Sequence, residues 1–303
     1  MRKNVDQIKE IMERFYHNHD RRESIDQDPI QFPHRYIYPE DIEIAGLVAS
    51  SFAFGRVTLI LPMVQKILDR MEGTPYEFIL NFDPKKDTRR FQGLYYRVWS
   101  SQDIICLMYG IHCILKKHKT LGRFFQHCYQ NRREKMHEAL SLFVEEVLKI
   151  DPSPIYGKNS HPPSFIHLLP SPKRGSACKR LNLFLRWMVR SGDGVDFGLW
   201  NHIPSSKLVI PLDAHIIRIS RFLGFHKRRT PDWKMAVEIT NTLRRFDPND
   251  PVKYDFALCH LGISNQCPLQ PHFLKCLKCE LQTICSRFKR RNRAKGLKAQ
   301  QLN

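Results

Sequence analysis

The sequence predicts an all-α protein, and three features of its 303 residues support this fold class. Apolar residues recur at helical spacing through most of the chain. Proline and acidic residues stand where helices are expected to begin, as in Pro39-Glu40-Asp41. No stretch alternates Val, Ile or Thr with polar residues over the length that a substantial sheet requires. We therefore expect packed helices, and 42% hydrophobic residues suffice for their core.

The expected helices follow one another with one long interruption. The first covers residues 3–17, and a strongly apolar helix follows Pro39. Further helices are expected at residues 56–72, 102–117, 120–130 and 133–149, before a Pro- and Ser-rich connection over residues 151–172.

The next expected helix, over residues 177–190, is amphipathic. Its apolar stripe contains Leu181, Leu185 and Met188. A second stripe contains Lys179, Asn182, Arg186 and Arg190, so we expect a cationic outer face that contacts phosphate.

Positive charge limits the partners that the protein can have. Lys and Arg number 49 against 30 Asp and Glu, so 49 − 30 gives a formal charge of +19. Residues 152–192 contain no acidic residue, and the tail after Cys285 is basic as well. Such a surplus attracts polyanions, which makes nucleic acid or an anionic membrane surface the first partner to expect. The longest apolar run, residues 44–55, is too short to cross a bilayer, and the N-terminus lacks a secretion signal, so a soluble cytoplasmic protein is expected.

Four of the nine cysteines are concentrated near the C-terminus. Cys267 and Cys276 are separated by eight residues, Cys276 and Cys279 by two, and Cys279 and Cys285 by five. Clustered thiols in a cytosolic chain indicate a metal rather than disulfides. One Cys-x-x-Cys pair with two flanking thiols favours a [4Fe–4S] cluster, with zinc as the lesser possibility. The other cysteines, which include Cys259, are expected in the core.

This cysteine spacing resembles the iron–sulfur loop of endonuclease III and its adenine-glycosylase relatives, which belong to the helix-hairpin-helix DNA glycosylases (HhH-GPD superfamily). The segment over residues 210–218 resembles the one in which the family's Asp begins a helix and His and Arg follow; these are Asp213, His215 and Arg218 here. Lys179 aligns with the catalytic Lys of the bifunctional members. The three matches occur in the family's order over about residues 160–290. More narrowly, the whole chain resembles an uncharacterised bacterial group within this superfamily.

The hairpin departs from the family pattern Leu-Pro-Gly-Val-Gly. Residues 168–177 keep one glycine, Gly175, and add Lys173 and Arg174, whose side chains are expected to contact phosphate instead. The interval of 34 residues from Lys179 to Asp213 is longer than in endonuclease III, and residues 191–206 account for the excess.

The resemblance implies a two-lobed fold. An N-terminal helix (residues 1–40) would join a C-terminal cluster lobe (residues 207–303), with a helical domain between them (residues 41–206) that ends in the hairpin-like segment 168–190. The cluster lobe would hold the iron–sulfur loop (residues 267–285) and a basic tail (residues 286–303).

The same resemblance implies a DNA glycosylase of base-excision repair with associated AP-lyase activity, acting on lesion-containing double-stranded DNA as a nucleoid-associated monomer. Asp213 would offset the positive charge that builds on the sugar, and Lys179 would attack the sugar to form a Schiff base. Simpler interpretations are that Asp213 only caps a helix and that Lys179 only binds phosphate.

The target base must leave the helical stack, and a side chain must fill the gap. Candidates are Phe52, Phe54 and Arg56, although phenylalanine at helical spacing is more often core. Further DNA contacts are expected from Lys173, Arg174, Gly175, Arg180 and Arg186. The alternative function is a non-catalytic, metal-stapled protein that binds DNA or RNA.

Overall fold

The computed structural model describes residues 5–132, 135–270 and 272–289. Within these ranges the regular elements are helices, and the only β-type pairings are the isolated bridges Tyr96–Trp99 and Ser176–Asp232. The predicted all-α class is therefore confirmed. None of the helices in the described ranges has the length and apolarity needed to span a bilayer. Most of the predicted basic tail, from residue 290 onward, lies outside the described residues.

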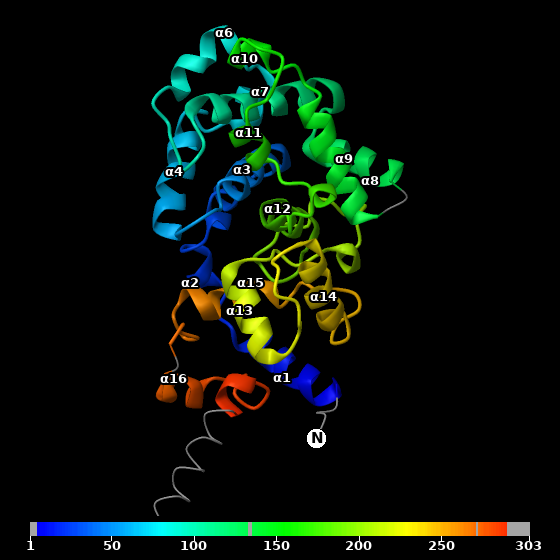
Figure 1. The fold of residues 1–303 in the computed structure, drawn as a ribbon. Coiled ribbons are helices and arrows are strands. Elements are labelled where there is room, and N and C mark those ends of the chain that lie inside the picture. The colour runs from blue at the N-terminus through cyan, green and yellow to red at the C-terminus, as the bar shows by residue number, and fades with distance from the viewer. Residues whose placement is uncertain (1–4, 133–134, 271, 290–303) are drawn as a thin grey trace, which may run out of the picture.

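One half of the molecule, at the top of Figure 1, is built around the buried helix α3 (Pro39–Ser51). Proline at the first position and two acids in the first turn favour the start of α3, and nearly all its side chains are buried. The other elements of this half are α4 (Val57–Asp69), α5 (Pro75–Leu80), α6 (Pro84–Asp87), η3 (Thr88–Phe91), α7 (Ser101–His118), α8 (Leu121–Asn131), α9 (Met136–Leu148), α10 (Ser153–Tyr156) and α11 (Pro163–Leu168).

The second half combines the two ends of the chain, as the blue and the yellow-to-red ribbons of Figure 1 show. In α1 (Val5–Asn18), Glu13 accepts hydrogen bonds from Lys253 at 3.0 Å and from Tyr254 at 2.5 Å. The remaining helices of this half are α13 (Ala214–Leu223), α14 (Trp233–Arg244), α15 (Asp255–Ile263) and α16 (Phe273–Lys278). The chain passes from α1 to α3 through α2 (Arg22–Ile25), η1 (Pro29–Gln31) and η2 (Pro33–Arg35).

Helix α12 (Lys179–Val189) lies between the halves and packs along α3. It is preceded by the 3₁₀ turn η4 (Pro172–Arg174), and η5 (Ser205–Lys207) lies between α12 and α13. Ten of its eleven side chains are buried, with Lys179 as the exception. The predicted cationic outer face of this helix is therefore wrong, because almost all of α12 is interior. Helix α12 is therefore an interior element that contacts both halves of the molecule.

Candidate active site

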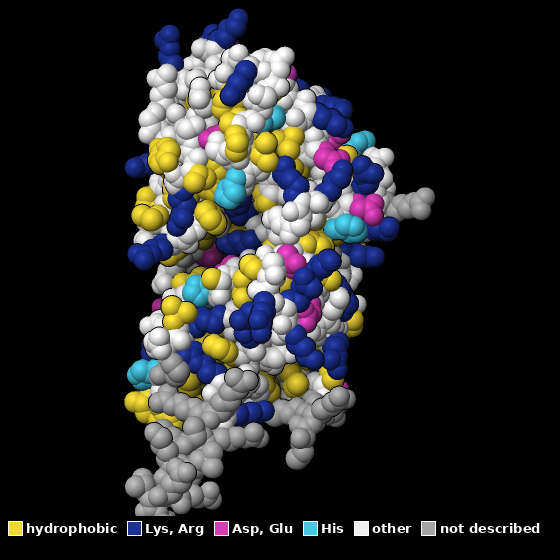
Figure 2. Space-filling model, viewed as in Figure 1, with side chains coloured by type: hydrophobic (Ala, Val, Ile, Leu, Met, Phe, Trp, Pro, Cys, Tyr) yellow, Lys and Arg dark blue, Asp and Glu magenta, His cyan; other side chains and the backbone are white. Residues whose placement is uncertain are grey.

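A partly open cavity of about 300 Å³ lies where the two halves meet α12. One side is formed by the connection between α3 and α4, the opposite side by the start of α13 and one face of α15, and the back by α12. Figure 2 shows a recess at this level between the two halves, with basic and acidic side chains in it. The side chains used below are Arg56, Lys179, Arg186, Asp213, His215, Asp255, Phe256 and Cys259, all of which line the cavity.

Asp213 enters this cavity as the N-cap residue of α13. Its Oδ1 accepts the backbone N–H of Ile216 at 2.7 Å, which satisfies one of the free amides at the start of the helix. Its Oδ2 accepts the thiol of Cys259 from α15 at 3.2 Å. Both oxygens are thus held, and the half-buried carboxylate is fixed in orientation.

Lys179 enters the same cavity as the first residue of α12. The preceding Cys178 adopts a left-handed backbone conformation, with φ of 51°, that turns the chain into the helix. The ammonium of Lys179 donates to the carbonyl of Ala53 at the end of α3, 2.9 Å away. Lys179 and Asp213 are 34 residues apart in sequence, and the fold brings both to one cavity.

A second, more open hollow of about 520 Å³ lies on the other side of Lys179. It follows the segment from α11 through η4 to α12, a helix–turn–helix arrangement. In this turn Lys173, Arg174 and Gly175 are exposed, and Gly175 has φ of 78°, a region that favours glycine. No side chain caps the N-terminus of α12, and Lys179 and Arg180 of its first turn line this hollow together with Arg174. Such a helix end suits an anion.

Two of the arginines expected to contact DNA are interior instead. Arg180 is 7% exposed and donates to the carbonyls of Ser51, at 3.1 Å, and His167. Arg186 is 2% exposed and donates to Asp196, at 3.2 Å, and to Asp255. Their predicted contacts with phosphate are corrected accordingly, because neither guanidinium reaches the surface.

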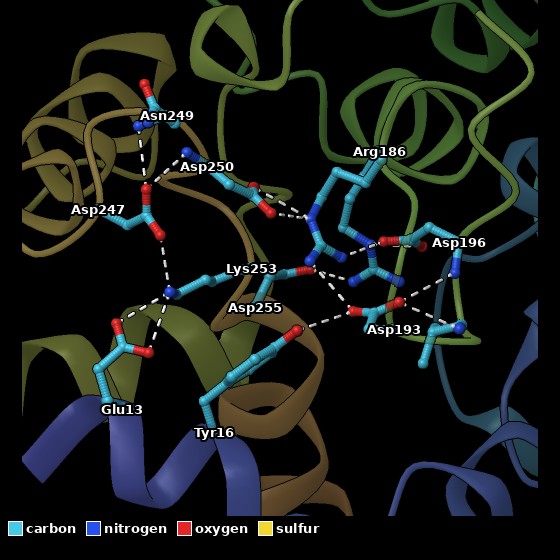
Figure 3. A network of polar contacts seen from close by, with 12 residues as sticks. Glu13, Tyr16, Arg186, Asp193, Asp196, Asp247, Asn249, Asp250, Lys253 and Asp255 are labelled. Carbon is cyan, nitrogen blue, oxygen red and sulfur yellow. Dashed lines mark hydrogen bonds and ion pairs between the residues drawn. The ribbon is translucent and has the colours of Figure 1, made fainter. Parts of the chain in front are cut away.

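Arg186 belongs to a buried network that Figure 3 shows from close by. Arg190, which directly follows α12, pairs with Asp193 at 3.1 Å, with Asp250 at 2.9 Å and with Asp196. Two guanidinium groups thus face more carboxylates than they can neutralise, and burial raises the pKa values of Asp196 and Asp250. The segment over residues 191–206, which the sequence presents as an insertion, supplies Asp193 and Asp196 and is therefore part of the core.

The three side chains expected to fill a gap in DNA differ in their exposure to solvent. Phe52 is fully buried against Trp99, so its predicted insertion into DNA is wrong. Phe54 is 42% exposed and stands between the guanidinium groups of Arg97 and Arg180. Arg56 is exposed at the rim of the cavity.

The four C-terminal cysteines are free thiols on one short segment around α16. The thiol of Cys279 interacts electrostatically with those of Cys267, Cys276 and Cys285, and burial is the main reason why its pKa is raised to about 11. Arg218 of α13 ties the segment to the second half of the molecule through the carbonyl of Cys267, at 2.6 Å.

In the described part of the chain, no three His, Cys, Asp or Glu side chains converge as a metal site. The donor set itself, four neighbouring thiols, fits an iron–sulfur cluster or zinc.

Sequence reasoning missed Asp255 and misjudged Cys259. Asp255 begins α15 and Cys259 follows four residues later, so the two share one face of the helix. Both line the cavity, whereas the sequence placed Cys259 simply in the core. The spacing of four residues between Asp255 and Cys259 could have indicated a shared helix face. It points to a site only once Asp213 is known to lie across the cavity from that face.

The fold and the cavity define a class: a two-part helical protein that holds a lysine and a carboxylate in one interlobe cavity. Residues 28–264 match the family described as "Protein of unknown function (DUF2400)", and the chain belongs to this family. The matched residues include the cavity and end before the first of the four clustered cysteines. No curated protein and no solved structure matches the chain.

Proposed function

We propose that the protein is a DNA glycosylase with associated AP-lyase activity, which excises a damaged or mispaired base from double-stranded DNA. One observation carries the proposal: Lys179 and Asp213 line the same cavity, between the two halves of the molecule. The resemblance to helix-hairpin-helix glycosylases gives these two residues their roles. It also leads us to propose the helix-hairpin-helix glycosylase fold, beyond the all-helical architecture itself.

Asp213 stabilises the positive charge that develops on the sugar as the N-glycosidic bond breaks. Such a charge requires a fixed anion nearby, and preorganised electrostatic groups of this kind supply much of the rate enhancement in enzymes. The two hydrogen bonds to Asp213 hold the carboxylate in place without neutralising it.

Lys179 is the nucleophile. After the ammonium has given up a proton to solvent, its neutral nitrogen forms a bond to C1′ of the sugar while the bond from C1′ to the base breaks and the leaving base takes up a proton. The amine then loses a proton, the ring oxygen leaves C1′ and is protonated, and the resulting Schiff base permits strand cleavage by elimination. The hydrogen bond of Lys179 to a neutral carbonyl, rather than to a carboxylate, leaves the ammonium without a fixed counter-ion.

DNA binding is assigned to the exposed turn before α12 and to the rim of the cavity. Lys173 and Arg174 supply side-chain cations, and the N-terminus of α12 supplies backbone amides for a phosphate. Phe54 and Arg56 are the side chains available to fill the gap left by the extruded base.

Cys267, Cys276, Cys279 and Cys285 would hold a [4Fe–4S] cluster, which would cross-link the segment around α16. None of the four lines the cavity, so base release is assigned to the side chains of the cavity alone.

The test is base release from a panel of lesion-bearing duplexes, measured with the parent protein and with Asp213→Asn. Asparagine still caps α13 but cannot offset positive charge, so release should be lost while DNA binding persists. Asp232→Asn is the matched control, because Asp232 caps α14 through the N–H of Met235 at 2.8 Å and does not line the cavity.

Full activity in Asp213→Asn would contradict the assigned role of this residue. Salt-dependent DNA binding by the parent protein without release from any duplex would instead favour the non-catalytic alternative.

A further inference from the structure

One oxygen of Asp255 is a buried hydrogen-bond acceptor without a partner among the described residues. Asp255 is 2% exposed; its Oδ2 is held by Arg186, while its Oδ1 accepts no hydrogen bond. The side chain lines the interlobe cavity. Because an unpaired buried acceptor is unfavourable, a native structure that keeps one at a cavity wall has a reason for it.

The potential donors around Asp255 are already engaged. From α12, Lys179 donates to Ala53 and Arg186 to Asp196 as well as Asp255. From α15, the thiol of Cys259 donates to Asp213.

The other charged and titratable groups at the cavity leave this oxygen free as well. Asp28 accepts from Ile30 at 3.0 Å and is within 3.3 Å of His260. His215 is neutral in character, because burial lowers its pKa, and Arg56 stands at the exposed rim. Among the described side chains at the cavity, Oδ1 of Asp255 is therefore an acceptor that no protein group occupies.

Apolar side chains also line this cavity. Phe256 follows Asp255 directly, and Leu183 and Ile60 face the cavity from α12 and α4. A volume of about 300 Å³ stands at the lower end of the range for small-molecule pockets. Apolar side chains together with an unoccupied acceptor suit a flat heterocycle that has an N–H on its edge.

We propose that Oδ1 of Asp255 reads the extruded base by accepting its ring N–H. This inference rests on the proposed function and deepens it, since it names the substrate class: bases with a lactam or imide N–H, such as hypoxanthine, guanine and uracil. Bases with an unprotonated ring nitrogen at that edge, such as adenine and cytosine, are disfavoured because two acceptors would face each other. A site built to bond an N–H rejects an analogue that lacks it.

The test is the binding of purine bases that carry a methyl group at N9, which stands for the sugar and removes the imidazole N–H, to the full-length protein, measured by calorimetry at pH 8. Among these N9-methylated bases, hypoxanthine should bind at least about tenfold more tightly than adenine and than 1-methylhypoxanthine, in which a methyl group replaces the N–H. This comparison needs no variant, so it does not depend on whether a variant folds. Equal affinity for the three ligands, or no binding of hypoxanthine, would overturn the inference.

Two variants locate the effect. In Asp255→Asn the amide oxygen must face Arg186, which turns the amide nitrogen, a donor, toward the cavity. The preference should therefore shift from hypoxanthine to adenine. Asp196→Asn changes another carboxylate on the same guanidinium, outside the cavity lining, and should keep the preference for hypoxanthine. An unchanged preference in a folded Asp255→Asn would contradict the proposal.

The outcomes also separate this inference from the proposed function. A ligand preference that depends on Asp255, without excision from any duplex, would support the pocket and refute the glycosylase. Excision that does not depend on a ring N–H of the base, with the same selectivity in the parent protein and in Asp255→Asn, would support the glycosylase and refute the role of Asp255.

Discussion

Sγ of Cys259 donates a hydrogen bond to Oδ2 of Asp213 across 3.2 Å, from the face of one helix to the N-cap of another. Burial raises the pKa of this thiol well above its ordinary value, and the negative charge of Asp213 raises it further. The thiol therefore stays protonated and acts as a donor at neutral pH. Cys259 is thus a positioning residue for the carboxylate that we assign to catalysis.

Cys259→Ala should slow base release in a single turnover by about tenfold, because a hydrogen bond to a charged group is lost. Cys259→Ser restores a donor and should recover most of the rate, which a merely space-filling role would not explain. Cys128→Ala, at a buried cysteine outside the cavity, is the control and should leave the rate unchanged. A normal rate in Cys259→Ala would show that the backbone amide alone positions Asp213.

Borohydride added during turnover should leave the protein covalently attached to DNA, since it reduces the Schiff base formed by Lys179. Lys179→Gln should abolish this adduct. Lys173→Gln should weaken DNA binding but still permit trapping, because Lys173 is exposed, pairs with Glu145 at 2.9 Å and does not line the cavity. Both products are measured on a denaturing gel.

The reverse pattern, with trapping lost only in Lys173→Gln, would show that the wrong lysine was chosen. Base release without any trapping would make water the nucleophile, with Asp213 as the remaining catalytic group.

Arg190→Met should lower the free energy of unfolding by about 3–5 kcal/mol, because it leaves buried carboxylates without their partner. Arg90→Met, which removes the ion pairs of an exposed arginine with Glu72 and Asp87, should cost much less, because water already solvates the guanidinium. Urea denaturation measures both. Similar losses in the two variants would mean that the buried network does not stabilise the fold.

The deficit of Arg190→Met should also depend on pH. Burial already raises the pKa values of Asp196 and Asp250, and removal of the guanidinium raises them further. A carboxyl group whose pKa is raised by folding contributes stability at low pH and loses it as pH rises through the raised value. The difference from the parent protein should thus be smaller at pH 5 than at pH 8.

Protein purified without oxygen should be brown, as expected from the resemblance to iron–sulfur glycosylases, and Cys276→Ser should remove the colour and destabilise the segment around α16. Cys113→Ser, on α7, is the control and should keep the colour. Absorption spectra and metal analysis give the answer. A colourless protein with one zinc per chain would assign the four thiols to zinc instead.

Much of the fold follows from periodicity in the sequence. The helices expected at residues 3–17, 56–72, 102–117 and 120–130 form as α1, α4, α7 and α8, and local signals such as the capping box at Ser100 and the cap at Thr120 set where α7 and α8 begin. Short helices such as α5 and α10 escaped prediction because they have too few turns to show a period.

The periodicity of the sequence did not predict which side chains are buried where ion pairs between distant segments decide it. Arg186 and Arg190 lie on a polar stripe of the expected helix, and their spacing alone suggests a solvated face. They are interior because Asp196 and Asp255 approach from other segments. Likewise Phe52 and Phe54 are two residues apart, yet only the end of α3 decides that one is core and the other exposed.

The bonds from Glu13 to Lys253 and Tyr254 join residues about 240 positions apart. During synthesis α1 leaves the ribosome long before these partners do. Met12 and Phe15, which are buried in the finished protein, stay exposed until the residues that pack against α1 have been made. The half of the molecule that contains Asp213 and Asp255 is therefore completed only after α15 has emerged from the ribosome, and the cavity cannot close before that point.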